Sequence, residues 1–244
     1  MKGMFIINTQ SKSHTKIVSS ACNGVKQALP IMLGYVPLGI AYGVLAQQAN
    51  IGLWPTAGLS IFVFAGASQF MAVSMIQNGI MPGAIILSTF IVNIRYVLMS
   101  ASLSPKLNSW KTWQRILLGG VMSDETFILH SLNFGNGNQD FISAMSINLS
   151  AYLSWAVSSV LGYNMGMLIA APEAWGFDFA LPAMFVGLLL SACKNKAAVT
   201  AAVAGGVISV TLHLLGVDSW AAFSGALGGA TVGILFYMKE GLGS

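Results

Sequence analysis

Charged side chains are scarce in this 244-residue chain, where Asp, Glu, Lys and Arg make up 7% and hydrophobic residues 55%. A soluble domain carries roughly 25% charged residues, so this chain lacks the charge to cover a water-facing surface. No Asp, Glu, Lys or Arg occurs between Lys26 and Arg95, or between Asp140 and Glu173. Uncharged apolar runs of about 18 residues or more are typical of membrane-spanning helices. The composition therefore excludes a soluble globular protein and predicts an all-α integral membrane protein.

Other absences narrow the function. The two cysteines, Cys22 and Cys193, lack the spacing of a metal site or a C-x-x-C motif, so free thiols, no metal and no cofactor are expected. No Walker motif is present, which excludes ATP as the direct energy source. The net charge of +4 comes without a basic run interleaved with aromatics, so we expect no nucleic-acid partner. Residues 1–27 lack a long apolar core and are predicted to be a cytoplasmic tail.

Eight apolar segments follow this tail within a single predicted transmembrane domain, residues 28–240. Their hydropathy identifies them without saying whether each one crosses the bilayer. The segments are Leu29–Gln47, Pro55–Ile76, Pro82–Leu103, Trp113–Leu132, Phe141–Ile169, Phe177–Ala192, Ala197–Leu215 and Trp220–Met238.

Loop charges decide how many of these segments cross. With the basic tail inside, eight crossings would put Lys106, Lys111 and Arg115 outside, against the positive-inside rule. If the second and sixth segments instead dip in and return, these cations face the cytoplasm and Asp140 and Asp218 lie outside. We therefore predict six crossings and two re-entrant segments.

The two halves also match weakly at an offset of 115, which aligns Phe64 with Phe179 and Phe70 with Phe185. Repeats over 28–135 and 140–240 would each hold an odd number of crossings and so be inverted. Inverted repeats with interrupted helices are typical of secondary transporters, with the solute site near the bilayer midplane.

The first span contains Tyr35, Val36, Pro37 and Gly39, followed by Gly43. Proline removes a backbone donor and disfavours helical geometry in the residue before it. One interpretation is a broken helix whose free backbone groups line a cavity. The alternative is a kinked helix with a small-residue packing face.

The second segment carries small residues between aromatics over Phe64–Phe70. Gly66 and Ala67 suit a tight re-entrant tip, where free amides at a helix N-terminus can hold an anion. Ser68 and Gln69 would add side-chain donors there. The alternative is that these polar groups only join helices within the bundle.

The third and fourth segments bring Asn93, Arg95, Asp124 and Glu125 into apolar surroundings. Intramembrane charges are expensive, tend to pair, and mark functional sites by default. Arg95 could instead extend toward the headgroups near the helix end. Asp124, Glu125 and His130 are the predicted ion-pair or proton-coupling residues, His130 being the weaker candidate. The predicted substrate-binding residues are Tyr35, Val36, Pro37, Gly39, Phe64, Gly66, Ala67, Ser68, Gln69, Phe70, Asn93 and Arg95.

In combination, these motifs resemble the AzlC family, the large subunit of branched-chain amino acid exporters of the AzlCD (YgaZH) type. The resemblance extends over residues 28–190. It implies export of Leu, Ile, Val and Met, a location in the bacterial cytoplasmic membrane, and a small membrane partner of the AzlD type. Tyr96 departs from the family pattern, which often has His there. The matching motifs are Pro37 with Gly39, Phe64–Phe70, Asn93–Arg95, Ser104–Pro105 and Ser123–Glu125.

The predicted function is thus a transporter for branched-chain amino acids, with transport of another small solute as a close alternative. A different class remains open. Gly66-Ala67-Ser68 resembles the nucleophile loop of intramembrane serine hydrolases, with His213 as a candidate base. That alternative leaves Arg95, Asp124 and Glu125 unexplained, as does a purely structural membrane subunit.

Overall fold

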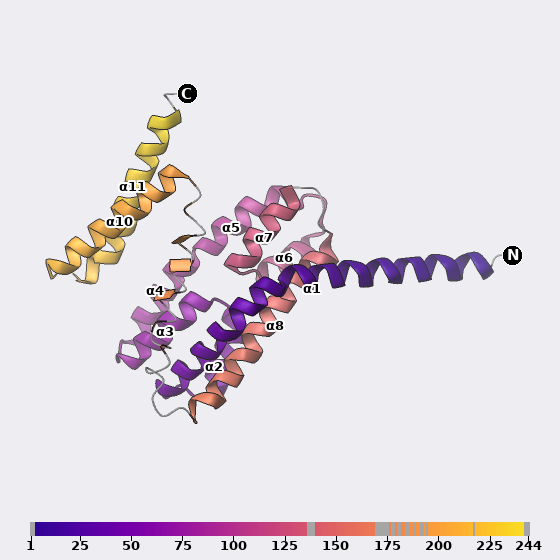
Figure 1. The fold of residues 1–244 in the computed structure, drawn as a ribbon, viewed down its shortest axis with the longest axis horizontal. Helices are drawn as coiled ribbons and strands as arrows, with labels where there is room; N and C mark the ends of the chain where they lie inside the picture. Colours follow the sequence, from indigo (N-terminus) through magenta and orange to yellow (C-terminus); the bar gives the residue numbers. More distant parts are fainter. Residues whose placement is uncertain are drawn as a thin grey trace. The chain divides into compact units, whose positions relative to one another are not determined.

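The computed structural model describes residues 3–135, 140–168, 195–216 and 218–241, with isolated positions between 176 and 193. It divides into two compact units, Met1–Leu181 and Pro182–Ser244. The described residues form helices and turns without a strand (Figure 1), which confirms the predicted all-α fold. The sixth apolar segment lies mostly outside the described residues, so its re-entrant course stays a prediction. The helices long and apolar enough to span a membrane are Lys16–Gln48, Pro82–Leu107, Phe141–Gly166 and Lys196–Leu214.

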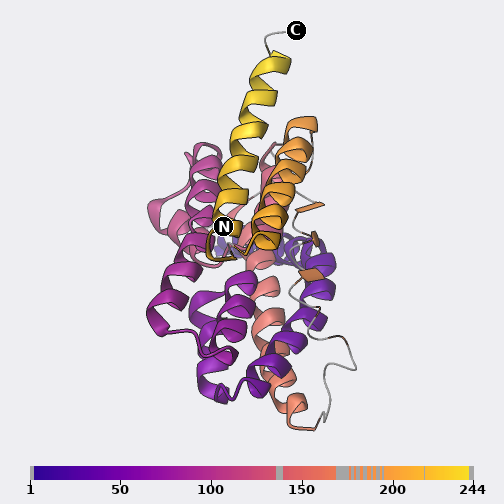
Figure 2. The same cartoon turned by 90° about the vertical axis from the view of Figure 1, so that its left-hand side faces the viewer.

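The scaffold of the first unit is a close pair of helices, α1 (Gly3–Gln48) and α8 (Phe141–Gly166), seen side by side in Figures 1 and 2. Glycines bring the two backbones together: a Cβ on Gly43 would lie 2.1 Å from the carbonyl oxygen of Ser159. A Cβ on Gly24 would likewise lie 2.4 Å from the carbonyl oxygen of Ser143. The contacts therefore advance toward the C-terminus along both helices. The two helices are therefore parallel. The alignment at offset 115 predicts opposite directions for these two spans, and the packing does not agree with it.

Helix α1 is continuous through Pro37, so of the two interpretations of the first span the broken helix is wrong. The alternative, a small-residue packing face, is what the structure contains, because Gly39 packs on Ser158 of α8. Proline is tolerated inside membrane helices where neighbouring groups accommodate the lost backbone bond. The helix also begins at Gly3, so the predicted N-terminal tail continues into the first span as helix.

The second apolar segment folds back on itself as a helical hairpin. It consists of α2 (Leu53–Gly58), the π-helix η1 (Leu59–Val63) and α3 (Gly66–Gln77). Thr56 and Phe70, on opposite sides of the tip, both contact Tyr42 of α1. Phe64 at the tip instead contacts Tyr35, two turns away along α1. The chain thus reverses direction at the tip, as the re-entrant prediction requires.

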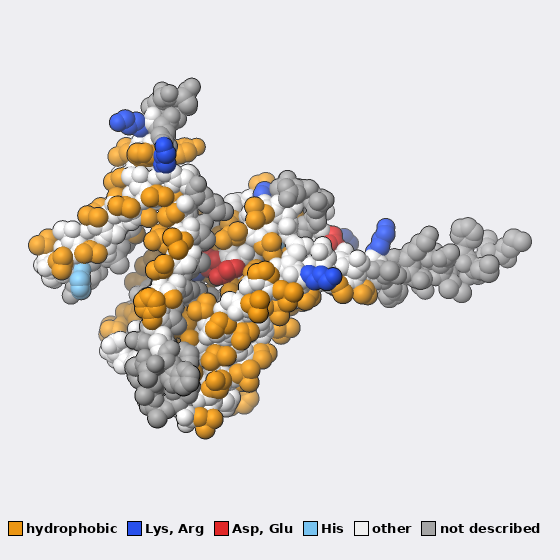
Figure 3. Space-filling model, viewed as in Figure 1, with side chains coloured by type: hydrophobic (Ala, Val, Ile, Leu, Met, Phe, Trp, Pro, Cys, Tyr) orange, Lys and Arg blue, Asp and Glu red, His pale blue; other side chains and the backbone are white. Residues whose placement is uncertain are grey.

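The third segment consists of α4 (Pro82–Asn93), α5 (Arg95–Leu103) and the 3-10 helix η2 (Ser104–Leu107). Its side chains are largely exposed, and Figure 3 shows apolar side chains spread over the described part of the surface in view, with few charged ones among them. This surface suits contact with lipid. Arg95 is the fourteenth residue of the 26-residue stretch, so it lies at mid-depth and is not near the helix end.

The fourth segment also folds back, so the prediction that it crosses the membrane is wrong. It forms α6 (Thr112–Gly120) and α7 (Asp124–Gly135). Asn148 of α8 donates to the carbonyl oxygen of Leu118 and contacts His130, which places both arms beside the same point of α8. Hydropathy misses this reversal because an apolar hairpin and an apolar crossing have similar composition.

This hairpin also moves the predicted position of Asp140. Trp113, at the start of α6, has its ring 5.2 Å from that of Phe141, at the start of α8. Asp140 therefore lies at the same end of the unit as Lys111 and Arg115, and not at the opposite end.

The two hairpins enter the first unit from opposite ends. The C-termini of α1 and α8 lie at the same end of the unit, because Gly166 packs on Val44 and Gln47. The α2–α3 hairpin follows the C-terminus of α1, and the α6–α7 hairpin precedes the N-terminus of α8 at the other end. Each hairpin is followed by one long membrane-spanning segment. A hairpin and its span together occupy residues 53–107 in the first case and 112–166 in the second. A hairpin and a span thus occur twice in opposite orientations, within the first unit.

The second unit contains α10 (Lys196–Leu214) and α11 (Asp218–Gly241), which pack as an antiparallel pair. Asn195 caps α10 by accepting a hydrogen bond from the Ala198 amide at 2.8 Å. Glycines again allow close contact: a Cβ on Gly205 would lie 2.8 Å from the carbonyl oxygen of Gly225.

Candidate functional site

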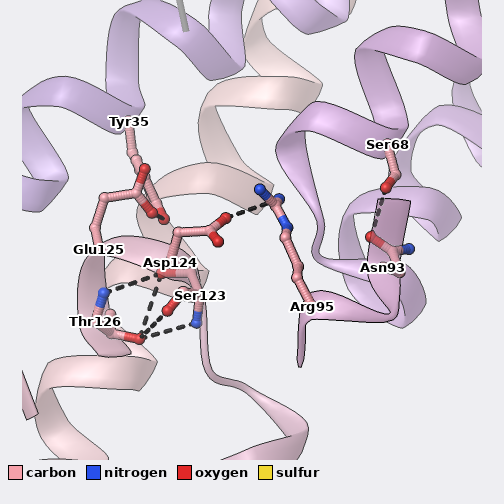
Figure 4. Close-up of polar contacts among 8 residues, drawn as sticks. All are labelled: Tyr35, Ser68, Asn93, Arg95, Ser123, Asp124, Glu125 and Thr126. Atoms are coloured by element: carbon pink, nitrogen blue, oxygen red, sulfur yellow. Dashed lines mark hydrogen bonds and ion pairs between the residues drawn. The ribbon is translucent and has the colours of Figure 1, made fainter. Parts of the chain in front are cut away.

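Charged and polar side chains gather where the two hairpin tips meet the middle of the long helices (Figure 4). Each contributing segment is interrupted at this point. The first hairpin turns at Phe64 and Ala65, α4 gives way to α5 at Ile94, and α6 ends before Asp124 begins α7. Interrupted backbone at membrane depth is tolerated only where it is buried in protein or lines a cavity. These interruptions are therefore the first sign of a site.

An ion pair lies at the centre of the site. Arg95 Nη2 is 2.8 Å from Asp124 Oδ2, and the two side chains are 27% and 13% exposed. This finding agrees with the predicted pairing of intramembrane charges. Arg95 Nε has no hydrogen-bond partner among the described residues, and the guanidinium carbon lies 5.3 Å from the Tyr96 ring centroid. The guanidinium thus keeps donor capacity beyond its bond to Asp124.

The second carboxylate has a neutral partner. The hydroxyl of Tyr35 on α1 donates a hydrogen bond to Glu125 Oε2. The Tyr35 ring packs edge-on against Phe64 at 6.5 Å and against Trp155 at 5.3 Å between centroids. Tyr35, one of the predicted substrate-binding residues, therefore packs among aromatic side chains beside the site and also supplies a polar contact that the sequence did not suggest.

The local sequence explains why α7 begins here. Ser123 Oγ accepts from the Thr126 amide at 3.3 Å, and Thr126 Oγ1 accepts from the Ser123 amide at 2.9 Å. This reciprocal arrangement is similar to a capping box and fixes the helix start. It places Asp124 and Glu125 in the first turn, where the helix dipole favours negative charge.

The start of α3 has a different character. Phe64 is left-handed, with φ of 43°, a conformation that is uncommon outside glycine and that turns the chain sharply. No side chain in the described part of the protein caps the helix at Ala65. Ser68, in its first turn, donates to Asn93 Oδ1 at 2.5 Å, which ties the tip to the α4–α5 junction. Gly66 and Ala67 lie in the same turn, so their amides are free of a side-chain cap at the site.

Gln69 has a structural role instead. Its Nε2 donates to Ser60 Oγ at 3.0 Å, and its Oε1 accepts from Trp155 Nε1 at 3.0 Å. Ser60 in turn donates to Ser159 of α8. For Gln69 the alternative interpretation, polar groups that join helices, is the one the structure contains. Phe70 is buried beside it, against Tyr42 and Trp155.

Several predicted residues lie away from the ion pair. Val36 is 43% exposed, Pro37 is also on the exposed face of α1, and Gly39 packs against α8. His130 is fully buried, and its Nε2 lies 2.7 Å from Asn148 Oδ1, where it holds α7 to α8. The described contacts thus give Gly39 a packing role and His130 an anchoring role, while Val36 and Pro37 lie on the exposed surface of α1.

The hydrolase alternative requires Ser68 to give its proton to a base. A serine hydroxyl has a single proton, and in this structure Ser68 donates it to Asn93. That geometry favours a positioning role for Ser68 at the tip.

Sequence reasoning missed residues that complete the site. Trp155 is 2% exposed and contacts Tyr35, Tyr42, Phe70 and Gln69. The sequence around it indicates an apolar membrane span and gives no sign of a site. Ser123 and Thr126 were detectable. Their spacing of three, before an apolar run, is close to the capping-box pattern and signals a helix start.

The arrangement offers one cationic and two anionic groups beside an aromatic wall, halfway along the spans. No cluster of His, Cys, Asp and Glu able to hold a metal occurs among the residues that the structure describes. Such a site can pair with both charges of a zwitterion while it accommodates an apolar group.

Comparison with known proteins agrees with the motifs. The model of the AzlC protein family matches residues 30–169, which include both hairpins and the ion pair. This chain belongs to the AzlC family. The resemblance drawn from the sequence motifs is thereby confirmed, and the chain is a multi-pass membrane protein like its relatives.

The relatives are similar over most of their length. The chain is 30% identical over 208 residues to an uncharacterized membrane protein of Archaeoglobus fulgidus, covering 84% of this chain and 90% of that one. It is 28% identical to the inner membrane protein YgaZ of Escherichia coli, over 78% and 80%. It is 25% identical to the branched-chain amino acid transport protein AzlC of Bacillus subtilis, over 86% and 82%. No solved structure matches.

Proposed function

We propose that this AzlC-family chain exports branched-chain amino acids from the cytoplasm, together with a small membrane partner of the AzlD type. The observation that carries the proposal is the meeting of two opposed hairpin tips at mid-depth, where they gather Arg95, Asp124 and Glu125. Solute sites formed by interrupted helices near the midplane are typical of secondary transporters. The name of the Bacillus subtilis relative supports the substrate class.

The chemistry of an amino acid matches the groups present. A zwitterion that leaves water needs a partner for each charge, since unpaired charges at membrane depth are costly. Arg95 can hold a carboxylate through its planar fork, with the free amides of the α3 first turn beside it. Asp124 or Glu125 can receive the ammonium group. Tyr35 and Phe64 then offer an apolar wall to a branched side chain.

Export also fits the distribution of basic residues. Lys106, Lys111 and Arg115 lie together at one end of the first unit, which the positive-inside rule assigns to the cytoplasm. The α6–α7 hairpin begins at this end, so we infer that its tip is reached from the cytoplasm. Asp124 and Glu125 are the titratable groups that would carry a coupled proton if a proton gradient drives export.

Leucine efflux tests the proposal. Cells or proteoliposomes loaded with labelled leucine should release it when this chain and a small membrane partner are both present. Full activity of the chain alone would contradict the partner requirement. Within this assay, Arg95→Lys should lower the efflux rate by about tenfold or more, because lysine keeps the charge but not the planar fork.

A structural ion pair would behave differently. Lysine preserves a salt bridge to Asp124, so near-normal efflux by Arg95→Lys would contradict a substrate role for the guanidinium. Membrane expression and a single symmetric elution peak of the variant separate a loss of transport from a loss of folding.

A further inference from the structure

A pocket lies in the first unit between α5, η2 and α6, apart from the ion pair. It encloses about 320 Å³, near the lower end of the volumes typical of small-molecule sites. Its apolar lining includes Leu103, Leu107, Leu118 and Met122, each at most 5% exposed. These side chains are also the buried hydrophobic cluster of this end of the unit. The cavity thus has a buried, apolar floor suited to an aliphatic group.

A fixed positive charge lies in the lining of this pocket. Arg115 donates from Nε to the carbonyl oxygen of Trp110 at 3.1 Å and from Nη2 to that of Asn108 at 2.8 Å. These bonds hold the guanidinium in place and use two of its five N–H donors. Ser100 and Ser104 add hydroxyl oxygens to the same lining. An apolar floor beside a held cation and hydroxyls suits a small molecule with an aliphatic side chain and a carboxylate.

The lining of the pocket lies close to the central site along the chain. Ser100 lies five residues after Arg95 on the same helix, a rise of about 7.5 Å. Met122 immediately precedes the cap of α7, two residues before Asp124. The pocket therefore lies about one to two helical turns from the ion pair, on the side of the basic residues of 106–115.

We propose that this pocket is an entry subsite, which binds the free branched-chain amino acid before it moves to the Arg95–Asp124 pair. The inference rests on the proposed function. Leu103, Leu107, Leu118 and Met122 hold the aliphatic side chain, and Arg115 holds the carboxylate. The aliphatic floor makes the subsite selective for leucine and isoleucine over small or polar amino acids.

The C-terminal turn of α6 offers a matched pair of variants. Gly119 lines the pocket and its neighbour Gly120 does not, and a Cβ built on either meets no atom within 4 Å. Gly119→Leu fills the pocket, whereas Gly120→Leu adds the same side chain outside it. In leucine efflux, Gly119→Leu should raise the half-saturating leucine concentration about tenfold or more, since a few methylenes in a hydrophobic pocket discriminate by that factor. Gly120→Leu should stay within about twofold. Equal shifts in both variants would overturn the subsite.

A second measurement does not depend on transport. In a chain carrying Cys22→Ser and Cys193→Ser, either Gly119→Cys or Gly120→Cys is labelled with a thiol reagent in the presence and absence of leucine. Leucine should slow labelling at 119 at least about threefold and leave 120 unchanged. Equal labelling at 119 with and without leucine, or protection by laurate but not by leucine, would show a lipid groove instead and overturn the proposal. Absence of leucine efflux from the unaltered chain would overturn the proposed function but would not affect this labelling result.

Discussion

The α2–α3 and α6–α7 hairpins reach the middle of the first unit from opposite ends, and different chemistry holds their tips. Neutral groups fix the α2–α3 tip. Buried Gln69 bonds to both Ser60 and Trp155, which are also buried, and Ser68 bonds to the partly buried Asn93. Charges hold the α6–α7 tip, through the contact of Asp124 with Arg95 and of Glu125 with Tyr35.

The difference shows which tip a solute can displace. Neutral hydrogen bonds sealed from water offer little to a zwitterion, and breaking them leaves buried groups unsatisfied. The α6–α7 contacts pair a cation and anions that the carboxylate and ammonium of an amino acid can replace one for one. Arg95 and Asp124 are also partly accessible, and Arg95 Nε is unpaired among the described groups. We therefore expect the α6–α7 tip to rearrange on binding while the α2–α3 tip keeps its position.

The largest expected effect on stability is at the α2–α3 tip. Gln69→Leu removes an acceptor from Trp155 and a donor to Ser60, all buried. An unsatisfied buried group costs about 1–3 kcal/mol, so the apparent melting temperature in detergent should fall by about 5 °C. Gln77→Leu, at the exposed end of the same helix, is the matched control and should change it by less than about 2 °C. Equal shifts would mean that the α2–α3 tip is not rigidly held.

A smaller change in stability, with a change in transport, is expected at the α6–α7 tip. Glu125→Gln keeps an acceptor for the Tyr35 hydroxyl and removes the charge. The melting temperature should stay within about 2 °C, while leucine efflux falls about tenfold, the equivalent of 1.4 kcal/mol. Asp140→Asn provides the control, because asparagine caps a helix as well as aspartate does. Unchanged efflux in Glu125→Gln would remove Glu125 from the site.

Much of the candidate site could be predicted from the sequence, because charged residues in membrane-spanning segments are costly and mark functional sites. The isolated Arg95, Asp124 and Glu125 indicated the site, and the small residues around Gly66 indicated a tip. Pairing was expected because charges at membrane depth need partners.

The reversal of the α6–α7 hairpin and the continuity of α1 could not be predicted from the local sequence. Hydropathy is alike for a crossing and for the α6–α7 hairpin, so the reversal near Ser123 depends on packing against Asn148 of α8. Pro37 suggested a break that tertiary contacts override, because α8 packs closely along α1 and the helix stays continuous. The real interruption at Phe64 contains no proline.

The central claim is that Arg95 binds the carboxylate of the transported amino acid, and equilibrium binding to the purified protein tests it most directly. Leucine and leucinamide share a side chain and an ammonium group and differ in the carboxylate. The unaltered protein should bind leucine about tenfold or more tightly than leucinamide, because hydrogen bonds between charged groups contribute about 1.5–3 kcal/mol. In Arg95→Gln, leucine and leucinamide should bind with similar affinity. A preference for leucine that is unchanged in Arg95→Gln would contradict the account.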